Sequence, residues 1–243
     1  MITTPAPGVE LTGRASIDGA PLFGPLELRL RAGEWTSLLG PSGVGKSTAL
    51  RLIADLPTGV HLDGAVRASD GRPLPGRVAY MAQSDLLLPW LDLIGNVLLG
   101  AHLRGERPDR SRAGDLLARV GLAGREAERP NHLSGGERQR VALARTLMED
   151  RPIVLLDEPF SALDAGIRAE MQELGAELLA GRTVLLVTHD PAEAARLGHR
   201  IFVLTETGLN EIPPPSSPPI REIADPAVFE CQTALFQALG QHA

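Results

Sequence analysis

The chain has 243 residues, of which 43% are hydrophobic, 22% charged and 3% aromatic, and its formal net charge is -6. This composition is typical of a globular protein with a sizeable core, and it excludes the basic face that general binding to nucleic acid requires. The single cysteine, Cys231, excludes an internal disulfide and favours a reducing compartment. No stretch approaches the roughly 20 uncharged apolar residues of a membrane-spanning helix. The first ten residues, MITTPAPGVE, do not resemble a secretory signal, so we expect a cytosolic protein.

Short apolar runs and helical patterns alternate along the chain. Residues 26–31 alternate with the period of a half-buried strand, and residues 34–39 lead into the glycine-rich loop GPSGVGKST at 40–48. Apolar residues at helical spacing follow that loop. This region therefore predicts a strand, a loop and a helix in order.

Three continuous apolar runs in the second half predict strands buried on both faces of a parallel sheet. They lie at 153–156, 183–187 and 201–204, and helical patterns at 167–180 and 191–197 separate them. The alternation predicts an α/β fold with a mainly parallel sheet.

The stretch from about 85 to 150 interrupts this alternation. It has three helix-like segments, at 92–103, 109–121 and 136–149, and no convincing strand. We interpret it as a helical subdomain inserted into the sheet core.

Proline dominates the chain after Asn210, which reads IPPPSSPP in residues 212–219. Proline prevents a central strand or a helix there, so we expect an extended surface segment. Composition leaves open whether this tail lies on the core or is a disordered extension. Residues 225–242 predict a small terminal helix.

The loop at 40–48 fits the phosphate-loop pattern GxxxxGKS, and it lies between a predicted strand and a predicted helix, as that motif requires. Its amides can surround an anion, Lys46 can contact the β- and γ-phosphates, and Ser47 can bind Mg²⁺. The alternative is a glycine-rich turn without a ligand, which the complete motif disfavours. The expected nucleotide-binding residues are Gly40, Pro41, Ser42, Gly43, Val44, Gly45, Lys46, Ser47 and Thr48.

Polar residues follow three of the apolar strands. Asp157 and Glu158 end the run at 153–156, where α/β ligands bind; Asp157 could hold Mg²⁺ and Glu158 could orient or deprotonate water. Paired acids there can also be simple helix caps. Gln83 and His189 also follow apolar strands, and for either one alone a structural polar residue is the better explanation.

Taken in order, these motifs resemble those of the ATP-binding subunits of ABC transporters. The loop at 40–48 looks like the Walker A motif, Gln83 like the Q-loop, and LSGGERQR at 133–140 like the family signature. IVLLDEP at 153–159 looks like Walker B, SALD at 161–164 like the D-loop, and THD at 188–190 like the switch-histidine loop.

The resemblance covers nearly the whole chain and implies its fold. It implies a phosphate-loop NTPase core with a mainly parallel sheet, an antiparallel β part near the N-terminus and an inserted helical subdomain. We therefore expect one ABC ATPase domain over residues 1–243. Its helical subdomain would span about 85–150 and its proline-rich C-terminal extension about 211–243.

The signature at 133–140 explains a second glycine pair. Ser134 and Glu137 fit a capping box, so a helix is expected to begin there. Gly135 and Gly136 leave the helix amides uncovered, which makes an anion-binding end. The resemblance implies that two cassettes meet head to tail, each signature completing the ATP site of the other.

The resemblance also implies a role for each motif residue. Ser47, Gln83 and Asp157 would organise Mg²⁺, Glu158 would act as general base, and His189 would contact the γ-phosphate. Ser134, Gly135 and Gly136 of a second copy would close the site, and Asp164 would link the two sites. One residue departs from the pattern. The family usually places an aromatic residue against adenine, but Ile17 lies near that position, and Phe23 is better explained as core.

Residues 83–97, QSDLLLPWLDLIGNV, are similar to the importers for nitrate, sulfonates, taurine and pyrimidine precursors of thiamine. Trp90 suits a permease contact or the core equally well. This resemblance implies an ATPase at the cytoplasmic face of the membrane that powers import of a small solute. Its partners would be integral membrane permease subunits, a second cassette in a homodimer and, indirectly, an extracytoplasmic solute-binding protein, with no nucleic acid.

The alternatives are an ABC exporter subunit, a soluble ABC ATPase of DNA repair or translation, and a small-molecule kinase. A repair ATPase needs a long coiled-coil insertion, and no heptad run of that kind is present. A translation ATPase carries two cassettes, and a kinase lacks the signature.

Overall fold

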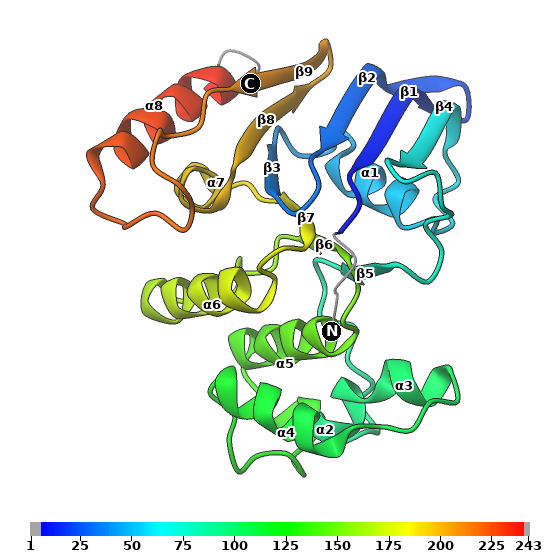
Figure 1. Ribbon diagram of the computed structural model, residues 1–243, viewed down its shortest axis with the longest axis vertical. Helices are drawn as coiled ribbons and strands as arrows, with labels where there is room; N and C mark the ends of the chain where they lie inside the picture. The colour runs from blue at the N-terminus through cyan, green and yellow to red at the C-terminus, as the bar shows by residue number, and fades with distance from the viewer. Residues whose placement is uncertain (1–5, 241–243) are drawn as a thin grey trace. The chain divides into compact units, whose positions relative to one another are not determined.

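The computed structural model describes residues 6–240, which divide into two compact units. The first unit contains the residues up to 78, residues 152–157 and the residues from 180 onward. The second contains Ala79–Arg151 and Glu158–Leu179. Figure 1 shows the helices and strands of each unit.

The first unit begins with a three-stranded antiparallel sheet of order β2-β1-β4. Its strands are β1 (Val9–Ile17), β2 (Ala20–Leu30) and β4 (His61–Ala68). Leu11 of β1 faces Leu28 of β2 and Val66 of β4 across the sheet. Because these pairs alternate with polar pairs, the sheet buries one face and exposes the other.

A mainly parallel sheet forms the centre of the first unit. Within this unit its strands run in the order β6-β7-β3-β8-β9, and only β9 is antiparallel to its neighbour. Every residue of β3, β6 and β7 is buried, as expected for strands covered on both faces. The bounds are β3 (Trp35–Leu39), β6 (Ile153–Asp157), β7 (Thr183–Val187), β8 (Arg200–Thr205) and β9 (Gly208–Ile212).

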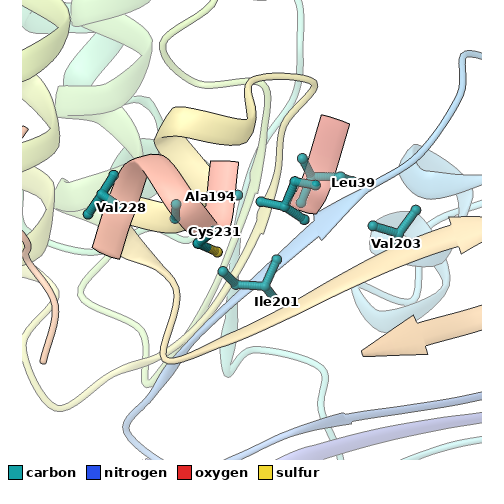
Figure 2. Close-up of a cluster of buried hydrophobic side chains, with 8 residues drawn as sticks. Leu39, Ala194, Ile201, Val203, Val228 and Cys231 are labelled. Carbon is teal, nitrogen blue, oxygen red and sulfur yellow. The ribbon is translucent and has the colours of Figure 1, made fainter. Parts of the chain in front are cut away.

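Three helices belong to this unit: α1 (Lys46–Ile53), α7 (Pro191–Leu197) and α8 (Pro226–Gly240). Helix α8 packs on α7 and on the sheet through one hydrophobic cluster, shown in Figure 2. We call it the α7–α8 cluster, and it contains Leu39, Ala194, Ala195, Ile201, Val203, Val228, Cys231 and Leu235. Burial in this cluster raises the pKa of the Cys231 thiol.

Helices dominate the second unit. Helix α5 lies against α2 and α4, and most of its buried residues are apolar, among them Val141 and Leu147. The helices are α2 (Leu93–Val97), α3 (Leu99–Leu103), α4 (Arg110–Arg119), the 3-10 turn η1 (Pro130–His132), α5 (Gly135–Met148) and α6 (Ala165–Leu178). Strand β5 (Val78–Met81) crosses the boundary between the two units.

The α/β fold predicted from the sequence is confirmed, including the parallel strands, the antiparallel part and the three helical segments. The segment at 92–103 forms two short helices, α2 and α3, instead of one. The tail also differs in part from expectation. Residues 213–225 form no helix or strand, but Pro215 and Arg221 within them are buried.

The packing of α8 can be tested with two neighbouring residues. Leu235 is fully buried in the α7–α8 cluster, whereas the next residue, Phe236, is 57% exposed. We predict that Leu235→Ala lowers the free energy of unfolding by about 2–5 kcal/mol, because it leaves a cavity. Phe236→Ala should change it by no more than about 0.5 kcal/mol. Urea unfolding measures both, and equal effects would contradict the packing described here.

Candidate functional site: phosphate loop, strand ends and signature helix

The phosphate loop connects β3 to α1 and depends on glycine. Gly40, Gly43 and Gly45 have φ angles of 151°, 83° and 104°, which L side chains rarely adopt. A Cβ atom on Gly40 would lie 2.3 Å from the carbonyl oxygen of Leu204, and one on Gly45 2.6 Å from the Phe23 ring. Larger residues at these two positions would displace the loop.

Lys46 and Ser47 begin α1 and place their polar atoms at the loop. The Lys46 ammonium is nearly buried and donates hydrogen bonds to the carbonyl oxygens of Gly40 (2.7 Å) and Pro41 (2.8 Å). The Ser47 hydroxyl donates to Oδ1 of Asp157 at 3.1 Å. The Lys46 ammonium and the hydroxyl–carboxylate pair of Ser47 and Asp157 are thus both held at the start of α1.

The register of the parallel strands brings further residues to the same edge. Leu38 in β3 pairs with Val187 in β7, and Val187 pairs with Asp157 in β6. The amide of Thr188 donates to the Leu38 carbonyl at 3.2 Å, and His189 follows. The phosphate loop, Asp157 and His189 therefore all leave the sheet at its carboxyl edge, where α/β proteins bind ligands.

The pair formed by Ser47 and Asp157 fits a magnesium ion. Mg²⁺ prefers hard oxygen ligands and is usually bound by one or two carboxylates together with substrate phosphates. Among residues 6–240, no group of three or more His, Cys, Asp or Glu side chains could hold a metal by itself. A site made from Ser47 Oγ, Asp157 and nucleotide oxygens agrees with both facts.

The second unit carries the signature at the start of α5. Ser134 caps this helix: its hydroxyl accepts from the Glu137 amide at 3.2 Å, and the Glu137 carboxylate accepts from the Ser134 amide at 2.7 Å. The predicted capping box is thus confirmed. Hydrogen bonds from the Ser134 amide and the Arg125 guanidinium lower the pKa of Glu137 to about 2.

The two glycines of the signature have different surroundings. A Cβ atom on Gly136 would lie 3.0 Å from the carbonyl oxygen of Ala162, whereas one on Gly135 would have only the end of the Arg138 side chain nearby, at 3.9 Å. Gly136 therefore allows α5 to lie close to residues 161–164, the D-loop. Gly135 leaves the end of α5 open.

Glu158 has an unusual backbone conformation. Its φ angle is 50°, a left-handed value that costs a residue other than glycine about 1–3 kcal/mol. The Glu158 carboxylate accepts a hydrogen bond from the side-chain amide of Gln83 at 3.1 Å. The backbone carbonyl of Glu158 accepts one from the Ser161 hydroxyl at 3.0 Å. The structure thus brings together Gln83 and Glu158 within the second unit.

Gln139 is a site residue that sequence reasoning missed. It lies in α5 and is buried, and its amide nitrogen donates to the Glu158 carbonyl at 2.8 Å. Its amide oxygen accepts from the Ala162 amide, also at 2.8 Å. Gln139 thus ties the signature helix to Glu158 and to the D-loop. On sequence alone it is one of several polar residues in LSGGERQR, and no pattern marks it as buried.

Asp164 ends the D-loop and caps α6. Its Oδ1 accepts a hydrogen bond from the Ile167 amide at 3.1 Å. The structure thus gives Asp164 a clear role at a helix N-terminus, and its proposed role between two cassettes requires a second copy of the chain.

Residues near the expected adenine position have contrasting exposure. Phe23 is buried, and its ring packs so close to Gly45 that a Cβ atom there would lie 2.6 Å from it. Ile17, at the end of β1, is 41% exposed. Phe23 is therefore a core residue that supports the loop, and Ile17 is the accessible apolar side chain of the two.

The segment after Gln83 is held in place by three buried or half-buried side chains. Arg145 donates to the carbonyl oxygens of Asp85 (2.6 Å) and Leu86 (2.9 Å). Asn96, which is fully buried, accepts from the Leu88 amide at 2.7 Å. Arg138 pairs with the Asp85 carboxylate at 3.0 Å. This segment is therefore held by hydrogen bonds from α5 and by one of its own side chains.

The same segment presents two large apolar side chains to solvent. Leu86 is 62% exposed and has a left-handed φ of 47°, and Trp90 is 66% exposed. Trp90 therefore does not fill the core of the helical unit, which was one of its two interpretations. A rigid loop with an exposed tryptophan is typical of a surface that binds another protein.

Comparison with known proteins assigns the family. Residues 23–161 match the family described as ABC transporter. The chain belongs to the ABC transporter family. It is an ATP-binding subunit with ATPase activity, as the motif order predicted.

Several curated relatives of this ABC subunit have similar lengths. An uncharacterized ABC transporter ATP-binding protein of Haemophilus influenzae is 44% identical over 93% of this chain and 95% of its own. An aliphatic sulfonates import ATP-binding protein of Rhodococcus jostii is 50% identical over 76% of this chain and 73% of its own. Another of that name, from Streptomyces avermitilis, is 43% identical over 99% of this chain and 93% of its own.

A solved structure supports the fold of this ABC subunit. The ATP-binding cassette MJ0796, solved as a dimer in a post-hydrolysis state with ADP and Pi, matches with a TM-score of 0.72. It is 31% identical over 88% of this chain and 99% of that chain. Within residues 6–240 of the ABC subunit, no helix has the length and apolar character needed to cross a membrane.

The capping box generates a pH-dependent prediction. Because the pKa of Glu137 falls from 4.5 to about 2 on folding, its ionised form stabilises the native state above pH 4.5. This contribution should be lost as the pH falls from 4.5 towards 2. We predict that wild type is more stable than Glu137→Gln at pH 7. The difference in stability should shrink between about pH 5 and 3, because Glu137 of the unfolded chain becomes protonated in this range.

Urea unfolding of both proteins at several pH values measures this difference. Glu230→Gln is a suitable control, because Glu230 is an exposed carboxylate outside the signature. A stability difference that stays constant from pH 7 to pH 3 would show that Glu137 does not act through its charge.

Proposed function

We propose that this ABC subunit hydrolyses ATP to drive import of aliphatic sulfonates through a membrane permease. The observation that carries the proposal is the name shared by its relatives, aliphatic sulfonates import ATP-binding protein, at 40–50% identity. Nitrate, taurine and thiamine-precursor importers are the related solute classes that the segment 83–97 also resembles. The subunit would lie at the cytoplasmic face of the membrane as a peripheral protein.

In this proposal the phosphate loop binds the triphosphate. The amides of residues 43–48 surround the β- and γ-phosphates, and Lys46 moves its ammonium from the loop carbonyls to them. Ser47, Asp157 and Gln83 would hold Mg²⁺. When bound with ATP, this ion neutralises charge on the phosphate oxygens.

Glu158 would act as general base. It takes a proton from water, the water oxygen bonds to the γ-phosphorus, and the bond to the β–γ bridging oxygen breaks to give ADP and inorganic phosphate. The hydrogen bonds to Glu158 from Gln83 and Gln139 support this role, since they fix its carboxylate and its backbone. His189 would contact the γ-phosphate and the attacking water.

A second copy of the chain would complete each site. The N-terminal end of α5, formed by Ser134, Gly135 and Gly136, has amides suited to an anion. The open surroundings of Gly135 support close approach of a phosphate. Asp164 would contact the partner across the interface. The MJ0796 cassette was solved as a dimer, which supports the pairing of two copies. In our proposal the two copies meet head to tail, ATP closes the dimer, and opening follows hydrolysis.

The exposed pair formed by Leu86 and Trp90 would contact the permease. The hydrogen bonds from Asn96 and Arg145 hold the loop in one conformation, so little conformational entropy is lost when a partner binds. Substrate binding would occur on the permease and on an extracytoplasmic solute-binding protein.

Glu158→Gln tests the catalytic part of the proposal. We predict that this variant binds ATP with unchanged affinity, that its turnover falls by about 10²–10⁴-fold, and that ATP holds it as a dimer. Nucleotide-binding fluorescence, phosphate release and light scattering measure the three properties. Wild-type turnover in Glu158→Gln would refute the assignment of the base.

Purification from membranes tests the transport part. We predict that tagged Glu158→Gln with ATP and Mg²⁺ recovers a multi-spanning partner, and that the further change Trp90→Ser loses it. Leu56→Ser is the matched control, because Leu56 is an exposed leucine in the other unit.

The recovered partner, reconstituted with its binding protein, should raise ATP turnover when an alkanesulfonate is added. Stimulation by nitrate alone would replace the proposed solute. Recovery of soluble dimers without a membrane protein would instead favour a soluble ABC ATPase.

A further inference from the structure

Arg221 is a buried charged residue in the segment between β9 and α8. Only 4% of its surface is exposed, and its guanidinium donates four hydrogen bonds to main-chain carbonyl oxygens. The acceptors are Ala195 (2.7 Å), Gly198 (2.8 Å), Pro215 (3.0 Å) and Ser217 (2.7 Å). A planar guanidinium with five N–H donors can join several chain segments in this way, which an ammonium cannot match.

Two of these bonds attach Arg221 to the C-terminal end of α7. The last carbonyls of a helix have no partner within it, and a positive charge there is favoured by the helix dipole. The attachment is reciprocal, because the Arg196 guanidinium donates to the Arg221 carbonyl at 3.0 Å and the Arg221 amide donates to the Arg196 carbonyl at 3.2 Å. The final turn of α7 is thus bound to the C-terminal segment by side chains and by main chain.

Helix α8 also packs against α7. Val228 and Cys231 of α8 lie in the α7–α8 cluster with Ala194 of α7, as Figure 2 shows. Leu39, which directly precedes the phosphate loop, belongs to the same cluster. The C-terminal segment therefore supports α7 from its end and from its side.

The other end of α7 carries the His189 loop. Helix α7 begins at Pro191, and the Asp190 carboxylate caps it by accepting from the Ala192 amide at 2.9 Å. The Asp190 amide in turn donates to the Thr188 hydroxyl at 3.0 Å. Because α7 is only about 10 Å long at 1.5 Å per residue, a shift at its C-terminal end moves its N-terminal end as well.

We infer that Arg221 is a positioning residue for ATP hydrolysis, which acts by holding α7 so that His189 faces the γ-phosphate correctly. The C-terminal segment thereby serves the catalytic step, through a residue outside every nucleotide-binding motif. This inference rests on the role proposed above for His189. Displacements of about 1 Å at a catalytic group can cost 100-fold in rate, so the loss of this support should be measurable.

The test compares Arg221→Gln with Arg221→Lys, each with and without His189→Ala, in the purified full chain. Arg221→Gln should lower ATP turnover by about 10-fold or more and leave the affinity for a fluorescent ATP analogue unchanged. Arg221→Lys keeps the charge with fewer donors, so it should recover part of the turnover. Arg67→Gln, an exposed arginine in the same unit, should behave as wild type.

The double variant separates positioning from general structural damage. In the His189→Ala background, Arg221→Gln should cause no further loss beyond about twofold, because the group through which it acts is absent. If Arg221→Gln lowers turnover by the same factor with His189 present and with His189→Ala, the inference is overturned. It is also overturned if Arg221→Gln keeps wild-type turnover while His189→Ala lowers it. Wild-type turnover in His189→Ala refutes instead the role proposed for His189. If Arg221→Gln does not fold, Arg221→Lys and Val228→Ala, which loosens α8, are compared in the same way.

Discussion

The site in the first unit depends on the register between three parallel strands. Leu38, Val187 and Asp157 are paired across β3, β7 and β6, so the strands end in line. A shift of one residue in any strand would turn its buried side chains to the opposite face. The same shift would separate Ser47 from Asp157. Hydrophobic burial on both faces of the sheet therefore determines where the polar site is formed.

The second unit achieves its geometry by a different means. There the backbone of Glu158 has a left-handed conformation, and Gln139 donates a hydrogen bond to the Glu158 carbonyl while accepting one from the Ala162 amide. A buried amide that bonds two chain segments is favourable only when both of its ends are satisfied. Gln139 meets this condition, and it joins the signature helix to the backbone of the residue proposed as the base. Strain at one residue is thus offset by polar contacts made elsewhere in the same unit.

Sequence patterns predicted the central strands, the phosphate loop and the capping box, because each depends on local spacing. They did not predict β4, whose exposed and half-buried residues show no clear alternation and which forms because β1 offers it a partner. Gln139 and Arg221 were also missed. Both are polar residues in polar stretches, and only contacts between distant segments make them buried. The conformation of Trp90 likewise depends on Asn96 and Arg145, so its exposure could not be predicted from the apolar run around it.

The single cysteine gives the chain an internal reporter. Cys231 lies on the buried face of α8, where its thiol is shielded and its pKa is raised, so in the native state it is a poor nucleophile. A thiol-specific reagent can react only while α8 is detached. The rate of labelling, relative to that of an unfolded thiol, thus measures the free energy of that local opening. Comparing the rate with and without nucleotide would show whether the C-terminal helix becomes more firmly attached when the phosphate loop is occupied.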